Sequence, residues 1–303
     1  MLRVTFLGTS ASAPTLGRGL PALAVRRAGE LLLFDCGEGT QRQMIRYGTG
    51  FDVAAIFFSH FHADHYLGAI GFLRTLSMHG RTEPLALHGP RPAARLLPTM
   101  LFTGVEALSF QVEIHEAEPG EVVRRPGAAV RAFATSHGIP SLGWAIEEDA
   151  RPGRFHPDRA RALGVPEGPL WGELQRGRGV SVAGRSVEAD EVVEAPRPGR
   201  RVVVTGDTRP CAPTVEAARG ADLLVHDSTF GDAEAARAAE TMHATAREAA
   251  RVARQAGVGR LLLTHLSTRY DRDTAPLLEQ ARGEFDRVEV ASDGLTLEVP
   301  LPD

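Results

Sequence analysis

Three histidines and an aspartate are concentrated in one short segment near residue 60, which reads SHFHADH over residues 59–65. Imidazole nitrogens suit zinc and a carboxylate adds a hard oxygen ligand, so the segment has the composition of a metal site. His60 and His62 are two residues apart, so an extended chain leaving the apolar run Val53–Phe58 aims both to one side. Asp64 and His65 follow and can turn towards a second ion. The spacing therefore leaves room for two metal ions, which in known two-metal sites lie roughly 3.5–4 Å apart.

The pattern His-x-His-x-Asp-His after a strand resembles the hallmark of the metallo-β-lactamase superfamily, which leaves thioesters, lactams and phosphodiesters open as substrates. Further candidates follow in the order that the superfamily uses, each after an apolar run: His137 in ATSHG, Asp207 in VTGDT and His265 in LTHLS. The resemblance implies two metal ions bridged by Asp207, one bound by His60, His62 and His137 and the other by Asp64, His65 and His265.

Three further segments are similar to one branch of the superfamily, ribonuclease Z, the transfer RNA 3′-processing endonuclease. They are FDCGEGTQRQ at residues 34–43, HDSTF at 226–230 and HATA at 243–246. Asp227 stands where the branch commonly has Glu, which keeps the carboxylate but shortens its reach by one methylene. The resemblance covers nearly the whole chain.

The resemblance implies a zinc-dependent endoribonuclease that removes the 3′ trailer from precursor transfer RNA. Two Zn²⁺ per subunit, or Mn²⁺ as a substitute, would activate a water whose hydroxide attacks the phosphodiester in line. The products would be a 3′-hydroxyl on the transfer RNA and a 5′-phosphate on the trailer. Asp64 would orient the hydroxide and accept its proton, while His243, positioned by Asp227, would protonate the leaving oxygen.

Two other functions remain as alternatives. A dinuclear zinc hydrolase of small phosphodiesters or thioesters would use the same ligands, but would need neither the 34–43 signature nor a basic arm. An RNA-binding protein with an inactive metal site is disfavoured, because no metal ligand of the superfamily pattern is missing.

A segment dense in Gly and Pro, residues 151–200, interrupts the pattern of strands and helices. Residues 151–178 contain six arginines but only three acidic residues. This local excess of positive charge predicts a basic arm inserted into a single domain of residues 1–303. The stretches PGRF (152–155) and GVPEGP (164–169) match the flexible arm by which the branch grips transfer RNA, and such an arm serving a second subunit's site implies a homodimer. The candidate RNA-binding residues are Arg18, Arg151, Arg154, Arg159, Arg161 and Arg176.

A loop near the N-terminus departs from the family pattern Pro-x-Lys-x-Arg-Asn. Residues 14–19 read PTLGRG, which keeps Pro14 and Arg18 but lacks the Lys and the Asn. Because this loop bears on how the substrate 3′ end is read, with or without an encoded CCA, the cleavage register stays open.

The elements that must position these residues are short apolar strands alternating with helices, typical of an α/β protein. The resemblance implies an αββα sandwich, the metallo-β-lactamase fold, with two mixed β-sheets flanked by helices. Predicted helices cover 40–47, 66–78, 156–163, 170–175 and, most clearly, Ala233–Gln255, which Gly257 closes. Predicted strands are 2–7, 22–26, 31–34, 53–58, 85–88, 130–135, 202–205, 223–226, 261–264 and 288–291.

The amino-acid composition limits which partners and which cellular location we expect. The 303 residues include no Lys and no Asn, so all 34 positive charges are Arg, and the formal net charge is −4. That balance argues against a protein that coats nucleic acid, and no DNA partner is expected, although a local basic site remains open. Cys36 and Cys211 cannot build a disulfide framework, and the chain shows neither a signal peptide nor an apolar run of membrane-spanning length. We therefore expect a cytoplasmic protein without a membrane partner.

Overall fold

The computed structural model describes residues 1–103 and 107–302, which form two compact units. Unit 1 comprises residues 1–147 and 201–300, and unit 2 comprises residues 148–200 with the C-terminal residues from Leu301 onward. The predicted domain 1–303 also covers residues 104–106 and 303, which lie outside the described residues. The predicted arm 151–178 falls within unit 2.

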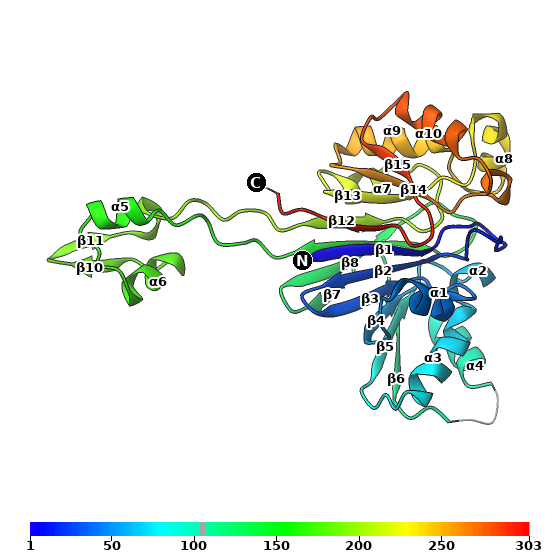
Figure 1. Ribbon diagram of the computed structural model, residues 1–303, viewed down its shortest axis with the longest axis horizontal. Coiled ribbons are helices and arrows are strands. Elements are labelled where there is room, and N and C mark those ends of the chain that lie inside the picture. The colour runs from blue at the N-terminus through cyan, green and yellow to red at the C-terminus, as the bar shows by residue number, and fades with distance from the viewer. Residues whose placement is uncertain (104–106, 303) are drawn as a thin grey trace. The chain divides into compact units, whose positions relative to one another are not determined.

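Unit 1 is built on two mixed sheets of seven strands each, and helices cover their outer faces (Figure 1). In the first sheet the order is β16-β1-β2-β3-β4-β5-β6, with neighbours from β3 to β6 parallel and the others antiparallel. The strands are β1 (Leu2–Gly8), β2 (Ala22–Arg27), β3 (Glu30–Phe34), β4 (Val53–Phe57), β5 (Leu85–Gly89), β6 (Val112–Glu116) and β16 (Thr296–Glu298). The helices of this half are α1 (Thr40–Tyr47), α2 (Ala63–Tyr66), α3 (Gly68–Met78) and α4 (Ala93–Leu101).

The second sheet has the order β15-β14-β13-β12-β9-β8-β7, with neighbours from β12 to β15 parallel. Its strands are β7 (Val122–Arg125), β8 (Ala128–Ala134), β9 (Leu142–Glu148), β12 (Arg201–Val204), β13 (Leu223–Asp227), β14 (Leu261–Thr264) and β15 (Val288–Val290). Its helices are α7 (Ala212–Ala218), α8 (Ala235–Glu240), α9 (Ala246–Ala256) and α10 (Ala275–Arg282).

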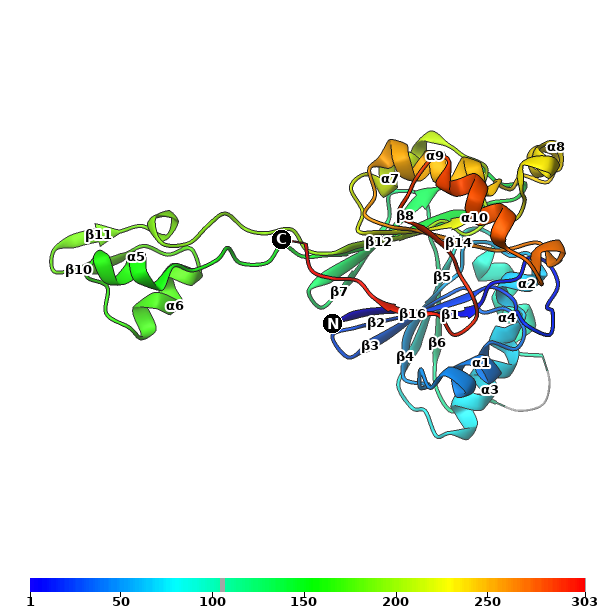
Figure 2. The ribbon, with the colours of Figure 1, turned by 45° about the horizontal axis from the view of Figure 1, so that its top comes forward.

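The two sheets pack face to face, and each also packs against helices on its other side (Figure 2). Between the sheets lie buried side chains from both, among them Phe6, Phe57, Trp144 and Val225. The Trp144 indole donates a hydrogen bond to the Phe58 carbonyl at 3.1 Å, which ties the second sheet to the first. This arrangement confirms the predicted αββα sandwich with two mixed sheets.

The longest predicted helix, Ala233–Gln255, is wrong as a single element. The structure has a 3-10 turn at Asp232–Glu234, then α8, then a break over residues 241–245, and only then α9. In α9, Thr245 caps the helix by accepting a hydrogen bond from the Glu248 amide, and the Glu248 side chain accepts one from the Thr245 amide. This capping box starts a new helix, and Met242 in the break has a φ of 61°. Gly257 closes α9 as predicted.

A buried histidine lies beside the inter-sheet core. The His88 ring on β5 stacks between Phe57 at 4.9 Å and His115 at 4.8 Å, and its Nδ1 has no hydrogen-bond partner among the described residues. Burial, together with the neighbouring His115 and Arg125, lowers the pKa of His88 to about 4. His88 is therefore neutral in the folded protein over a wide pH range and has a structural role.

Unit 2 has a small apolar core of its own, built from α5 (Pro157–Ala162), α6 (Pro169–Gln175) and the hairpin of β10 (Val180–Val182) and β11 (Arg185–Val187). Its chain leaves unit 1 after β9 and returns into β12. Residues 148–200 contain nine arginines and nine acidic residues, so the positive balance of residues 151–178 is offset by the rest of the unit. Among the described residues, none of the helices is long and apolar enough to cross a membrane.

Candidate metal centre and catalytic site

The first predicted cluster forms where β4, β8 and β12 end. His62 Nδ1 lies 3.0 Å from His60 Nε2 and 3.1 Å from His137 Nε2. Asp207 Oδ2 is 3.5 Å from His60 Nε2 and 4.0 Å from His137 Nε2. Four potential ligand atoms from three loops, all from residues that the sequence singled out, therefore lie within 4.8 Å of one another.

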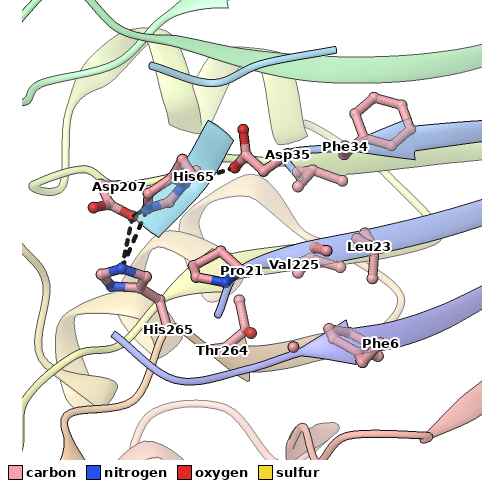
Figure 3. A pocket seen from close by; sticks show the side chains of 14 residues that line it. Phe6, Pro21, Leu23, Phe34, Asp35, His65, Asp207, Val225, Thr264 and His265 are labelled. Carbon is pink, nitrogen blue, oxygen red and sulfur yellow. Dashed lines mark hydrogen bonds and ion pairs between the residues drawn. The ribbon is translucent and has the colours of Figure 1, made fainter. Parts of the chain in front are cut away.

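The second cluster lies on the other side of Asp207. Asp207 Oδ1 is 3.3 Å from both His65 Nε2 and His265 Nε2, which are 3.4 Å from each other. Asp64 Oδ2 lies 3.7 Å from His65 Nε2 and 3.5 Å from His265 Nε2. Figure 3 shows His65, Asp207 and His265 pointing towards one another. One oxygen of Asp207 thus faces each cluster, the position expected of a bridging ligand.

The residues present fit a pair of metal ions. Asp207 Oδ1 is buried and accepts no hydrogen bond from the described residues, although two imidazole nitrogens lie 3.3 Å from it. A cation in each cluster would give this oxygen and the imidazole nitrogens that face one another within 3.0–3.4 Å a common partner. Nitrogen and carboxylate ligands of this kind are typical of zinc and compatible with manganese.

Outer hydrogen bonds fix the orientation of each ligand ring, as is usual in metal sites. His65 Nδ1 donates to Asp35 Oδ2 at 2.8 Å, and His265 Nδ1 lies 2.8 Å from Thr229 Oγ1. His137 Nδ1 donates to the Met242 carbonyl at 3.0 Å. Asp35 and Thr229 lie within two of the three signature segments, but the sequence assigned them no role. Their position next to the ligands could have been inferred only from the way the strands pair.

Burial and neighbouring charges set the protonation states of the clusters. Burial lowers the pKa of His60 well below its usual value, and His65 adds to this effect. Burial alone would raise the pKa of Asp207, but His265 and His65 outweigh it and hold that pKa well below its usual range. A neutral imidazole and an ionised carboxylate are the forms that bind a metal ion. Burial also acts to lower the pKa of His65, but Asp207 and Asp35 raise it well above normal, so a cation would take the place of a proton there.

His243 and Asp227 form a pair beside the clusters. His243 Nδ1 donates to Asp227 Oδ2 at 2.9 Å, and lies 3.9 Å from Asp207. Asp227 also accepts hydrogen bonds from the Thr208 amide and from the amide and hydroxyl of Thr229. These bonds occupy both oxygens of Asp227 and orient His243, and the two residues also form a group of potential ligand atoms with Asp207 and His265. Burial lowers the pKa of His243, but the Asp227 carboxylate outweighs it and raises that pKa to about 9.

A cavity of about 280 Å³ opens beside His243. Its walls include Ser12 of the N-terminal loop and two arginines whose guanidinium groups lie over the Phe230 ring, Arg237 at 6.0 Å and Arg269 at 5.8 Å. Neither Arg237 nor Arg269 was singled out from the sequence. Their cationic groups and the size of the cavity suit an anionic substrate segment next to the metal centre.

The six arginines predicted to bind RNA differ in whether their guanidinium groups already have partners within the protein. Arg18 donates to the Thr9 hydroxyl and to the Ala291 carbonyl, at 2.7 and 2.8 Å, so its guanidinium braces the loop that carries it. Arg151 donates to two carbonyl groups within unit 2. Arg154 and Arg159 are exposed and have no acidic partner among the described residues.

The other two arm arginines are in ion pairs. Arg161 pairs with Asp158 and Glu167, and Arg176 pairs with Glu173. These pairs are exposed, so each contributes little stability and could exchange for a phosphate. RNA binding by all six arginines remains a prediction.

Comparison with known proteins agrees with the fold. Residues 21–265 match the model of the metallo-beta-lactamase superfamily, which defines the class of the protein. The chain is 62% identical over 305 residues to the ribonuclease Z of Myxococcus xanthus, covering all of this chain and 99% of that protein. It is 53% identical to the ribonuclease Z of Gemmatimonas aurantiaca, covering 99% of this chain and 96% of that protein. The chain belongs to the ribonuclease Z family of this superfamily.

The solved structures give the same result. The short form of human tRNase Z superposes with a TM-score of 0.71 at 27% identity, covering 98% of this chain and 99% of the human chain. The metallo-beta-lactamase fold protein YhfI of Bacillus subtilis, at 19% identity and a TM-score of 0.69, shares the fold.

Proposed function

We propose that this protein is an endoribonuclease that removes the 3′ trailer from precursor transfer RNA, using two Zn²⁺ per subunit, with Mn²⁺ as a possible substitute. The similarity to ribonuclease Z proteins, which extends over nearly the whole chain, supports precursor transfer RNA as the substrate. The observation that carries the chemistry is the pair of clusters sharing Asp207, with His243 beside them. His60, His62 and His137 would hold one ion, Asp64, His65 and His265 the other, with Asp207 bridging.

When bound, two such ions supply Lewis-acid charge that acidifies a water and neutralises phosphodiester oxygens. The chain itself supplies orientation and proton transfer. Asp64 would orient the attacking water and accept its proton, since its carboxylate lies at the edge of the second cluster. His243 would protonate the leaving 3′-oxygen. Its Nδ1 is engaged by Asp227, which leaves Nε2 for the substrate.

Unit 2 would bind the body of the transfer RNA. Its phosphate contacts would come first from Arg154 and Arg159, which have no acidic partner among the described residues, and then from Arg161 and Arg176 by exchange of their exposed ion pairs. Because residues 148–200 carry no net charge, we expect RNA binding by unit 2 to depend on a few individually positioned guanidinium groups and not on a large net positive charge. Arg151 and Arg18 would act mainly by holding their own segments. A homodimer in the cytoplasm completes the proposal, since one subunit's arm could serve the partner's site.

A dinuclear hydrolase of small phosphodiesters or thioesters remains the competing function. The test compares kcat/KM for three substrates: a precursor transfer RNA with a 3′ trailer, the same trailer attached to an unstructured RNA, and bis(p-nitrophenyl) phosphate. The proposal expects strong preference for the precursor and a single cut at the trailer junction. Equal rates on both RNAs, or turnover of the small ester alone, would reject the proposal in favour of the competing function.

A further inference from the structure

Asp293, in the turn between β15 and β16, binds three donors that the proposed mechanism does not involve. Its Oδ1 accepts a hydrogen bond from Thr9 Oγ1 at 2.7 Å. Its Oδ2 accepts from the Gly19 amide and from Gln43 Nε2, both at 2.6 Å. Thr9 and Gly19 are the two ends of the segment 9–19, which contributes Ala11, Ser12 and Ala13 to the cavity beside His243. One carboxylate therefore ties together both ends of a loop at the active site.

Other contacts reinforce this base. Arg18 Nη1 donates to Thr9 Oγ1, and Thr9 in turn donates to Asp293, so guanidinium, hydroxyl and carboxylate form a chain. The Ser10 amide donates to the Gly19 carbonyl at 2.9 Å, which closes the loop through its backbone. A Cβ atom added at Gly19 would lie 3.2 Å from Gln43 Nε2 and 3.4 Å from Asp293 Oδ2. The absence of a side chain at Gly19 thus leaves room for Gln43 to reach Asp293.

The tip of the same loop contacts the metal centre. The Ser12 amide donates to Asp64 Oδ2 at 2.8 Å, the oxygen that also faces His65 and His265. Ser12 has a φ of 61°, a conformation that costs a non-glycine residue free energy and persists only where its surroundings enforce it. The Ser10 hydroxyl, which donates to the Ala13 carbonyl at 2.6 Å, provides part of that constraint.

We propose that Asp293 is a positioning residue for the second cluster. By holding both ends of the 9–19 loop, it keeps the Ser12 amide against Asp64 and so fixes the orientation of that carboxylate. The effect on catalysis rests on the proposed function, but the effect on metal binding does not, because it can be measured without RNA.

The test uses the full-length zinc protein with Asp293→Asn, which keeps the shape but replaces one acceptor oxygen by a donor. Asp52→Asn is the matched control, because Asp52 is a carboxylate that pairs with Arg26 on the surface and has no contact with the loop. Zinc affinity is measured by competition with a chromogenic chelator, and the exchange of the Ser12 amide by hydrogen–deuterium exchange. For Asp293→Asn we expect one of the two ions to bind about tenfold more weakly, as when an outer partner of a metal ligand is lost, and Ser12 to exchange faster. Asp52→Asn should change neither.

The kinetics separate positioning from general destabilisation. Asp293→Asn should lower kcat on the precursor and on bis(p-nitrophenyl) phosphate by the same factor, with KM for the precursor unchanged. Thr9→Val, which removes one of the three donors, should give a smaller change in the same direction. This variant tests the positioning role if Asp293→Asn does not fold. Unchanged zinc affinity and unchanged Ser12 exchange in a folded variant would overturn the proposal. If both shift but the wild-type protein does not cut the precursor, the proposed function fails and the positioning role stands.

Discussion

Replacing His243 by alanine isolates the proposed proton donor. The imidazole is held by Asp227 at 2.9 Å, it is not a member of either predicted set of metal ligands, and Asp227 remains satisfied by Thr208 and Thr229 after the change. We therefore expect His243→Ala to keep about two zinc ions per chain. A positioned general acid typically contributes 10²–10⁴-fold, so kcat on precursor transfer RNA should fall by about that factor, or roughly 3–5 kcal/mol in activation free energy.

The assay compares two leaving groups under single-turnover conditions. The 3′-oxygen of a ribose is strongly basic and needs a proton as it departs, whereas p-nitrophenolate departs without one. His243→Ala should therefore cost about 10²–10⁴-fold on the precursor but less than about tenfold on bis(p-nitrophenyl) phosphate. His79→Ala serves as the control, because His79 is exposed and its ring lies beside Phe51, and it should match the wild type on both substrates.

Two results would refute this reasoning. An equal loss on both substrates would mean that His243 stabilises charge or structure and does not protonate the leaving oxygen. A loss of zinc, measured by elemental analysis of the purified variant, would mean that His243 supports metal binding and that the assigned division of roles is wrong.

Three other outcomes are expected. Asp207→Ala should reduce the zinc content from two ions per chain to one or none, because it removes an oxygen from both clusters; retention of two ions in elemental analysis would contradict the bridging role. Replacing residues 149–199 by a short Gly-Ser turn should raise KM for precursor transfer RNA while sparing bis(p-nitrophenyl) phosphate, whereas a parallel loss would make unit 2 a folding element. His88 has a pKa of about 4 when folded and about 6.5 when unfolded, so the unfolded state binds more protons between these values and stability falls as pH drops through them. The wild type should lose about 2 kcal/mol more than His88→Phe between pH 7 and pH 5 in urea titrations, and identical losses would exclude this assignment.

Much of the fold could be predicted because its central strands are buried on both faces. Runs such as Leu31–Phe34 and Leu261–Thr264 are continuously apolar, and all ten predicted strands are present in the structure. The edge strands β6, β7 and β16 were missed, and so was β9 inside the second sheet, although its residues 142–146 are buried. β6 reads VEIHE and β16 reads TLE, and their side chains are partly exposed, so they lack an apolar run.

The break between α8 and α9 shows a second reason why part of the fold could not be predicted from the sequence. The Ala- and Arg-rich composition of residues 233–255 favours a continuous helix, and the capping pair of Thr245 and Glu248 was the local signal of a new start. That break allows the chain at Met242 to hold His137 and brings His243 beside Asp227. The sequence identified His243 by its motif but placed it within a longer helix.

The site itself was predictable where ligands follow strands. Every predicted metal ligand lies in one of the two clusters, because the carboxyl ends of β4, β12 and β14 meet at one edge of the sandwich. Asp35, Ser12 and Asp293 were not predicted. Each acts on a partner distant in sequence, such as Asp35 on His65 and Asp293 on Gly19, and only the folded chain brings these groups together.

The central claim is that the paired clusters cut transfer RNA precursors with bound divalent ions. The most direct measurement is incubation of the purified protein with a precursor bearing a 3′ trailer, with and without a chelator, followed by mapping of both product ends. The account predicts one cut that yields a 3′-hydroxyl on the transfer RNA and a 5′-phosphate on the trailer, lost with the chelator and restored by zinc or manganese. Cleavage that persists when the protein is shown to be metal-free, or no cleavage by protein that holds two ions, would contradict it.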